Sequence, residues 1–501
     1  MVRKNLDSKS LKINSLVNGI NQILTLIVPL ITTPYISRIF GASLIGKYSY
    51  YYSYLSYFTL IASFGFSLYG TKLVSENRNN KEARSNAFWG IMVSKAMVSF
   101  ISLLSFLTLI GLLKGDSDSK TLLLSMSLYI VAILVDPTFY FQGQEKFVSI
   151  SLRNIFIKII SLILIFSLVK SSSDLLLYSY ILSCSSLLST AIMFLSFRKN
   201  EICKLNWKQL NIKEILWQSF SFFGPSLASS LFLVLNQNLL GIIGKDDAEN
   251  GYFSEAQKFV NILASLSGSI SIVMLSRMSF LYETKNQKEI EDKIYKTFEA
   301  FWAVSFPCAF GLAVINPYLI PTFLGAQFTG SIPVLYVLCP IVVLSPLNSL
   351  FGSIYFKPAN KIWTQTYIML FSAIISIIFD LILIKPYKAI GCAIGSVIAE
   401  ASQLPLLIYY SRKEIKPSMV FGTAIKPFDS SLIMFIITFV FGKLMTDASV
   451  NKYVVLVGMI LIGIISYVLV SILFKNEFVM MMLKTVIKKA KEIHLKASKK
   501  A

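Results

Sequence analysis

Residues 453–474 read YVVLVGMILIGIISYVLVSILF, an unbroken apolar run that contains no charged side chain. A helix needs about twenty largely apolar residues to cross the roughly 30 Å hydrocarbon core of a bilayer, and this stretch is long enough. A helix also satisfies all of its own backbone hydrogen bonds, as a lipid environment requires. The stretch therefore predicts a transmembrane helix, and similar stretches elsewhere decide the fold.

About fourteen windows of this kind occur along the chain. They lie at 15–40, 48–69, 88–113, 121–141, 148–169, 175–197, 216–243, 252–277, 298–322, 331–355, 362–384, 390–410, 427–445 and 453–474. The first window is too long for the apolar core of a signal peptide, so we expect it to remain as a helix. The sequence therefore predicts an all-α polytopic membrane protein with about 14 transmembrane helices.

The composition supports this class, because 55% of the residues are hydrophobic, 15% are charged and the mean hydropathy is +0.66. Soluble domains carry about a quarter charged residues. The net charge of +21 is dispersed over short segments between the windows, which argues against nucleic-acid binding. Five separated cysteines and one histidine predict no disulfide framework, metal site or cofactor.

Enzyme signatures are weak in this chain. No Walker, G-x-S-x-G or H-E-x-x-H motif occurs. Asp116 and Asp118 form a D-x-D pair like that of metal-binding glycosyltransferases, but the neighbouring Lys114 and Lys120 favour a solvated loop. We therefore expect a protein that is not an enzyme.

The distribution of basic residues predicts the orientation. With the N-terminus inside, the inner segments hold roughly three times as many Lys and Arg residues as the outer ones, which places both termini in the cytoplasm. The basic tail, 475–501, alternates apolar residues with lysines. Two interpretations of it stay open, an amphipathic helix on anionic lipid and a solvated tail.

A weak internal repeat suggests two related halves. The matching positions are Pro29 and Pro225, Tyr48 and Tyr252, and the pairs Pro137/Gly143 and Pro346/Gly352. Repeats in transporters commonly flank the substrate path. The predicted organisation is a cytoplasmic segment at 1–14, an N-lobe of helices 1–6 at 15–197, a linker at 198–215, a C-lobe of helices 7–12 at 216–410, two helices at 411–474 and the tail at 475–501.

Four ionisable residues lie deep in the windows, namely Lys95, Asp136, Lys158 and Glu400. Each costs about 2.5–3.5 kcal/mol at mid-helix and should face a polar interior or a partner. The lysines could hold an anionic substrate group in a hydrated cavity. The alternative is an ion pair of Asp136 with Lys95 or Lys158 that ties helices together. Asp136 or Glu400 could instead titrate during transport.

Other charged residues lie closer to the window ends, where long side chains can reach the headgroups. These are Arg38, Arg153, Lys258, Arg277 and Asp380. Arg38, Arg153 and Lys258 remain secondary candidates for substrate binding. Asp380 joins Asp136 and Glu400 as a candidate for ion coupling.

Two motifs in the N-terminal third of the chain resemble those of a known family of membrane proteins. The first runs PYISRIFGA from Pro34 and includes Gly41, followed by GKY at 46–48, FGF at 64–66 and GTK at 70–72. The second runs DPTFYFQGQEKF from Asp136 and contains Gln142, Gly143 and Glu145. Both motifs resemble those of the Wzx-type polysaccharide repeat-unit flippases.

The resemblance implies the fold of the multidrug/oligosaccharidyl-lipid/polysaccharide (MOP) exporter superfamily, with two pseudo-symmetric six-helix lobes around a cavity plus two C-terminal helices. It implies flipping of an undecaprenyl-pyrophosphate-linked oligosaccharide to the outer leaflet of a bacterial cytoplasmic membrane by alternating access, for capsule, exopolysaccharide or O-antigen synthesis. Coupling to an H⁺ or Na⁺ gradient is expected. The expected partners are the lipid-linked substrate, membrane lipids, and a polymerase and glycosyltransferases.

Several relatives place arginines in the cavity, whereas this sequence offers Lys95 and Lys158 for the pyrophosphate. Two alternatives stay open. A drug/cation antiporter of the same fold would favour carboxylates in the cavity. A membrane polysaccharide polymerase or glycosyltransferase predicts a long outer loop with catalytic residues, and no segment between the windows is long enough.

Overall fold

The computed structural model describes residues 2–113, 116–197, 201–284, 287–485 and 488. Every regular element in these ranges is helical, and they contain no β-strand. The chain divides into two compact units, Met1–Gly251 and Tyr252–Ala501. The predicted all-α class is confirmed. The division into six, six and two helices stays a prediction.

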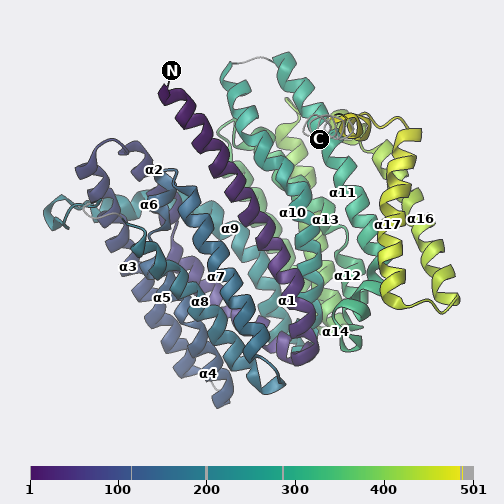
Figure 1. Ribbon diagram of the computed structural model, residues 1–501, viewed down its shortest axis with the longest axis horizontal. Coiled ribbons are helices and arrows are strands. Elements are labelled where there is room, and N and C mark those ends of the chain that lie inside the picture. The colour runs from purple at the N-terminus through teal and green to yellow at the C-terminus, as the bar shows by residue number, and fades with distance from the viewer. Residues whose placement is uncertain (1, 114–115, 198–200, 285–286, 486–487, 489–501) are drawn as a thin grey trace, which may run out of the picture. The chain divides into compact units, whose positions relative to one another are not determined.

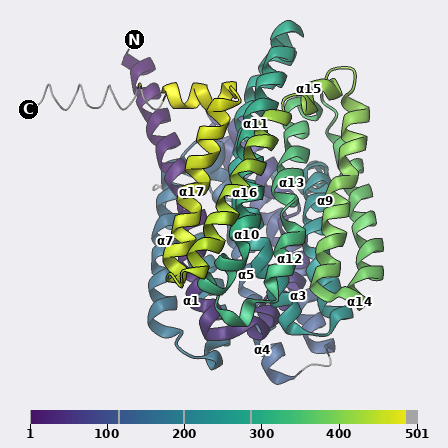
Figure 2. The same cartoon turned by 90° about the vertical axis from the view of Figure 1, so that its right-hand side faces the viewer.

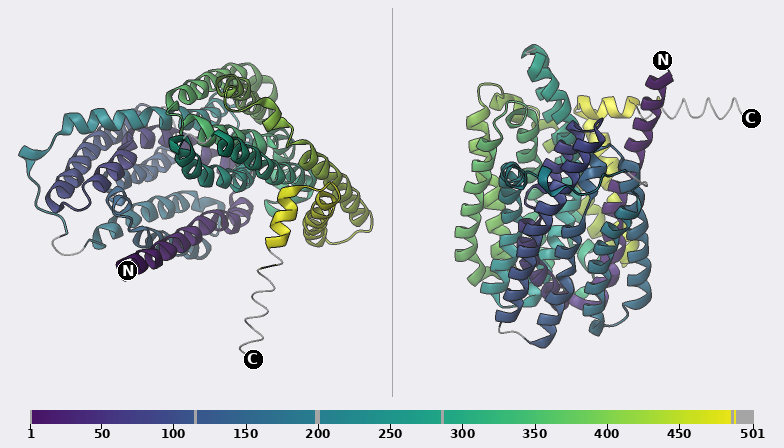
Figure 3. Two further views of the ribbon diagram at one scale, coloured as in Figure 1. Left: turned by 90° about the horizontal axis from the view of Figure 1, so that it is seen from above. Right: turned by 90° about the vertical axis from the view of Figure 1, so that its left-hand side faces the viewer.

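The first unit is built from long helices joined by short connections. They are α1 (Val2–Ser63), α2 (Phe66–Glu76), α3 (Lys81–Leu112), α4 (Ser117–Met126), α5 (Leu128–Val135), α6 (Thr138–Gly143), α7 (Phe147–Leu168), α8 (Leu175–Leu195), α9 (Ile212–Gly244) and the start of α10 (Asp247–Thr284). Figure 1 shows α5, α7 and α8 side by side. Many helices of this unit run roughly parallel, as spanning helices do (Figure 3).

Helix α1 is bent sharply at Gly41. Its 62 residues would measure roughly 93 Å if straight, far more than one membrane crossing. Gly41 has φ 67° and ψ −179°, a conformation that favours glycine, and it breaks the helix there. Beyond the bend, a Cβ on Gly46 would lie 1.6 Å from the carbonyl oxygen of Asp247, so α1 contacts α10 backbone to backbone. The short loop expected between the first two windows is therefore this bend followed by helix.

The window at 121–141 is not one continuous helix. It is divided into α4, α5 and α6, with the second break at Asp136–Pro137. Proline has no N–H to donate and disfavours helical backbone in the residue before it, and Asp136 accordingly has ψ 112°. The break leaves the backbone carbonyl of Asp136 in need of a partner.

The second unit continues from α10. It contains α11 (Gln287–Phe323), α12 (Ser331–Leu338), α13 (Ile341–Phe351), a π-helical turn (Gly352–Phe356), α14 (Ile362–Ser411), α15 (Pro417–Phe421), α16 (Ile425–Asp447) and α17 (Lys452–Leu473). Helix α14 is kinked at Lys388, which has φ 49° and ψ −125°. Its two halves pack closely, because a Cβ on Gly391 would lie 2.1 Å from the carbonyl oxygen of Leu383.

In the described part of the chain, 11 helices are long and apolar enough to cross a membrane. Two of them, Ile27–Glu76 and Ile362–Ser411, are 50 residues long and contain the bends at Gly41 and Lys388. Each of these two is long enough for two crossings. The prediction of a multi-pass membrane protein is confirmed, and the count of fourteen stays a prediction.

The beginning of the basic tail is folded onto the second unit. Residues 477–485 form a helix that lies across the end of α17 in Figure 2, beside the adjacent pair α16 and α17. The backbone N–H of Phe478 donates to Glu299 Oε1 at 3.1 Å, and Val479 is buried against Met434 and Tyr467. Met481 and Met482 stay exposed. A fully solvated tail is therefore wrong for 477–485, whereas 489–501 lie outside the described residues.

Candidate functional site

Lys95 lies on α3 with 1% of its surface exposed. Its ammonium donates to the backbone carbonyl of Asp136 at 2.9 Å and lies 3.7 Å from the Asp136 carboxylate. It also lies 6.0 Å from the centre of the Phe139 ring. Lys95 thus provides a hydrogen-bond donor for the Asp136 carbonyl, which the helix break at Asp136–Pro137 leaves without an intrahelical partner. Of the two interpretations of this lysine, the geometry favours the ion pair that ties helices together.

The other side of Asp136 is linked to α7. Its Oδ1 accepts from the backbone N–H of Thr138 at 3.0 Å, and the Thr138 hydroxyl accepts from Arg153 Nη1 at 3.1 Å. The partly buried Arg153 also donates to Asn154 Oδ1 at 2.8 Å. Three of the site residues that the sequence predicts therefore lie in one polar cluster inside the first unit, namely Lys95, Asp136 and Arg153.

Lys158 has a different environment from Lys95. It lies on α7, is only partly buried and donates to the hydroxyl of Thr25 on α1. Among the described residues no carboxylate forms an ion pair with it. Lys158 is therefore a deep cation of the first unit that retains surface for an anionic ligand.

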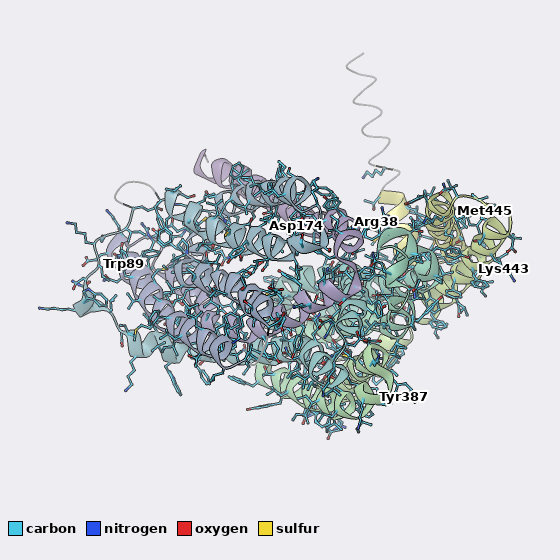
Figure 4. The ribbon with its side chains drawn as sticks, turned by 90° about the horizontal axis from the view of Figure 1, so that it is seen from below. Arg38, Trp89, Asp174, Tyr387, Lys443 and Met445 are labelled. Atoms are coloured by element: carbon cyan, nitrogen blue, oxygen red, sulfur yellow. The ribbon has the colours of Figure 1, made fainter. Side chains whose placement is uncertain are left out.

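The cations expected near the helix ends reach the surface. Arg38 is exposed on α1, three residues before the bend at Gly41 (Figure 4). Lys258 of α10 is also exposed and donates to the fully buried carboxylate of Glu255 at 2.6 Å. Arg277 forms an ion pair with Glu289. Lys258 and Arg277 are therefore each paired with a carboxylate of the second unit, and substrate binding by Lys258 stays a prediction.

Two carboxylates are buried on the two halves of α14. Glu400 is 5% exposed, and its Oε2 accepts from Asn348 Nδ2 at 2.6 Å and from Gln403 Nε2 at 3.1 Å. Asp380 is fully buried, so the expectation that it reaches the headgroups is wrong. Its Oδ1 has no hydrogen-bond partner among the described residues. Among the described residues, no Lys or Arg forms an ion pair with either carboxylate.

The second sequence motif fastens α6 to α2. The Gln142 side chain accepts from the Thr71 hydroxyl at 3.1 Å. A Cβ on Gly143 would lie 2.7 Å from the Cβ of Val74, so glycine allows the two helices to touch. Arg78 donates to the carbonyl of Gln144 at 2.6 Å and to Glu145 Oε2 at 3.2 Å.

Sequence reasoning missed the partners of this motif. Arg78 and Arg84 lie between the second and third windows, where the sequence predicts only basic residues of an inner segment, yet Arg84 donates to the Tyr140 hydroxyl at 3.1 Å and to the carbonyl of Arg78 at 2.7 Å. Asn348 was also missed. An amide in an otherwise apolar window is the signal that could have identified it.

The D-x-D pair shows no metal-binding geometry. Asp116 lies 3.3 Å from Lys47, and hydrogen bonds from Ser119 and Lys47 lower the pKa of Asp116. The described residues contain no group of three or more His, Cys, Asp and Glu side chains that could hold a metal ion.

The spanning helices, their bends and the charges buried among them define a multi-pass membrane protein. Solved structures share this fold. The lipid II flippase MurJ in an inward closed conformation is 18% identical, with a TM-score of 0.68 over 93% of this chain and 99% of MurJ. An inward-facing MATE multidrug resistance transporter of the MOP superfamily is 14% identical, with a TM-score of 0.57 over 80% of this chain and 99% of the transporter.

Residues 11–279, more than half of the chain, match the family described as "Polysaccharide biosynthesis protein", and the chain belongs to that family. Proteins named "Putative O-antigen transporter" from Escherichia coli (strain K12) and Shigella dysenteriae are each 23% identical over 410 residues. The matches cover 81% of this chain and 98% and 100% of those proteins. The resemblance drawn from the two sequence motifs is confirmed by this family match, the two relatives and the shared fold, and these relatives and solved structures are named as transporters or a flippase rather than as enzymes.

Proposed function

We propose that the chain flips undecaprenyl-pyrophosphate-linked oligosaccharide repeat units from the inner to the outer leaflet of a bacterial cytoplasmic membrane. The observation that carries the proposal is the partly exposed Lys158, a membrane-embedded cation without a carboxylate partner among the described residues. Membership of the polysaccharide biosynthesis family and the names of the two transporter relatives support it. The product would enter O-antigen, capsule or exopolysaccharide synthesis, and both termini would lie in the cytoplasm.

The physical problem for such a flippase is the pyrophosphate, because burying an unpaired anion in hydrocarbon is costly. A lysine ammonium offers three donors to phosphate oxygens and leaves room for bulky sugars. Lys158 would provide this contact while the polyprenyl tail stays in the bilayer. Inward-facing and outward-facing states would be selected by their different contacts with the substrate.

Energy coupling belongs to the same proposal. Buried carboxylates without ion-pair partners are candidates for binding H⁺ or Na⁺, because neutralisation removes the cost of burying the charge. Asp380 and Glu400 in the second unit meet this description, whereas Asp136 is held by Lys95. Glycosyltransferases would supply the lipid-linked units, and a polymerase would consume them.

Transport into vesicles tests the function. The purified chain is reconstituted, labelled lipid-linked repeat units are added on one side, and their appearance in the opposite leaflet is measured. We expect protein-dependent transfer that Lys158→Ala reduces at least tenfold and that Lys443→Ala, an exposed lysine on α16, leaves unchanged. Figure 4 shows Lys443 with Met445 on α16. Absence of transfer, with uptake of organic cations instead, would favour the antiporter alternative.

A further inference from the structure

Four tyrosines gather in the first unit where α1, α5 and α8 come together. Tyr48 and Tyr52 lie one turn apart on α1 beyond Gly41, with their rings stacked and their centroids 6.0 Å apart. Tyr129 of α5 meets Tyr52 edge-on at 5.9 Å, and Tyr178 of α8 meets Tyr48 edge-on at 5.4 Å. We call these four residues the tyrosine cluster.

The tyrosine cluster is not a sealed core. Tyr52 exposes 41% of its surface, and the other three rings are each partly exposed. The core of the same unit, in contrast, consists of fully buried rings such as Phe66 and Tyr140. Tyrosines at membrane interfaces ordinarily form an outward-facing belt. These rings differ from a belt, because they face one another across three helices.

The chemistry of the tyrosine cluster suits a neutral, hydroxyl-rich ligand. It offers apolar ring faces and phenolic hydroxyls without formal charge. Tyrosine provides large, rigid contact area together with a polar group. A sugar ring has the complementary surface, an apolar C–H face bordered by hydroxyl groups. A pyrophosphate would gain little here, because it needs cations.

The tyrosine cluster and Lys158 contact α1 on opposite sides of the bend at Gly41. Lys158 contacts Thr25, and the 16 residues from Thr25 to Gly41 span roughly 24 Å of helix. Tyr48 and Tyr52 follow the bend. The cationic position and the aromatic position are therefore separated by a distance on the scale of a short oligosaccharide.

We propose that the tyrosine cluster is a saccharide subsite, in which a sugar ring of the lipid-linked substrate stacks on Tyr52 while Lys158 contacts the pyrophosphate. This inference rests on the proposed function and names the part of the first unit that contacts the glycan. Tyr52 is the contact residue, because it is the most exposed ring of the four. Tyr48, Tyr129 and Tyr178 position it.

Binding measurements with two probes test the subsite. One probe is the lipid-linked repeat unit that accumulates in a host whose polysaccharide export depends on this chain, and the other is undecaprenyl pyrophosphate without sugar. We expect Tyr52→Ala to weaken glycolipid binding by the full chain about tenfold, equivalent to about 1.4 kcal/mol, and to leave binding of the sugar-free lipid unchanged. Tyr52→Phe keeps the ring and should retain most of the affinity.

Tyr367→Ala is the matched control, because Tyr367 is 65% exposed on α14 in the second unit. An equal loss for both probes, or no loss for either, would overturn the subsite. The proposed function fails separately. If vesicles show no glycolipid transfer but Tyr52→Ala still removes the sugar-dependent affinity, the subsite stands and the flippase proposal falls. Normal transfer with unchanged sugar-dependent affinity in Tyr52→Ala rejects the subsite alone.

Discussion

Truncation to alanine should affect different properties at the two deep lysines of the first unit, stability at Lys95 and transport at Lys158. Lys95→Ala removes the donor that satisfies the Asp136 carbonyl and the cation beside the Asp136 carboxylate. We therefore expect Lys95→Ala to destabilise the fold. Lys158→Ala removes a partly exposed group bonded only to a threonine hydroxyl among the described residues, and should reduce transport without a comparable loss of stability.

The expected loss of stability in Lys95→Ala follows from the groups that are left without a partner when the lysine is removed. Breaking a buried ion pair by removing one partner costs about 3–5 kcal/mol, and an unsatisfied buried carbonyl costs about 1–3 kcal/mol. The Asp136 side chain is 25% exposed and keeps its Thr138 bond, so water and Thr138 offset part of these costs, and we expect a loss of about 2–4 kcal/mol for Lys95→Ala. The double variant Lys95→Met/Asp136→Asn removes both charges and should recover at least half of that loss.

The assay is the melting temperature of each detergent-purified variant, followed by size-exclusion chromatography, together with transport in vesicles. Lys443→Ala controls for loss of a surface lysine. A Lys95→Ala protein as stable as the wild type, but inactive, would refute the structural assignment. It would return Lys95 to the substrate path.

Three further outcomes follow from the packing. Gly143→Ala should lower the free energy of unfolding by about 1–3 kcal/mol, because its Cβ would lie 2.7 Å from Val74 Cβ. The control Gly111→Ala, whose Cβ would have no atom within 4 Å, should be neutral or slightly stabilising, and equal melting temperatures of the two variants would contradict this. Arg78→Ala should lower stability by about 1 kcal/mol through loss of its Gln144 and Glu145 contacts, while Lys72→Ala breaks an exposed pair and should show no measurable change. Asp380→Asn should retain or raise the melting temperature while transport loses its dependence on an ion gradient; gradient-dependent transport in this variant would exclude Asp380 from coupling.

Helix positions were the most predictable part of the fold. Helices α7 and α17 match their windows nearly residue for residue, because lipid demands long apolar segments and the charged loops mark their ends. The bends were not predictable in the same way. Gly41 and Lys388 both interrupt helices, yet lysine carries no local signal for a kink, and the conformation at Lys388 is decided by how the halves of α14 pack.

The candidate site was predicted in composition but not in arrangement. The sequence indicated Lys95, Asp136, Lys158 and Glu400 as costly groups that need partners. It could not choose between Lys95 and Lys158 as the partner of Asp136, because that choice depends on how α3 and α7 face the break at Pro137. Asp380 was misplaced, since distance from a helix end does not report the packing of Gly395 against it.

The central claim is that the chain moves lipid-linked oligosaccharide and that Lys158 holds its anionic group. The most direct test is transfer of labelled lipid-linked repeat units across reconstituted vesicles by the wild type and by Lys158→Ala, at equal protein abundance and melting temperature. The account predicts rapid transfer by the wild type and at least a tenfold slower rate for Lys158→Ala. Equal rates would contradict the role of Lys158, and no transfer by the wild type would contradict the flippase proposal itself.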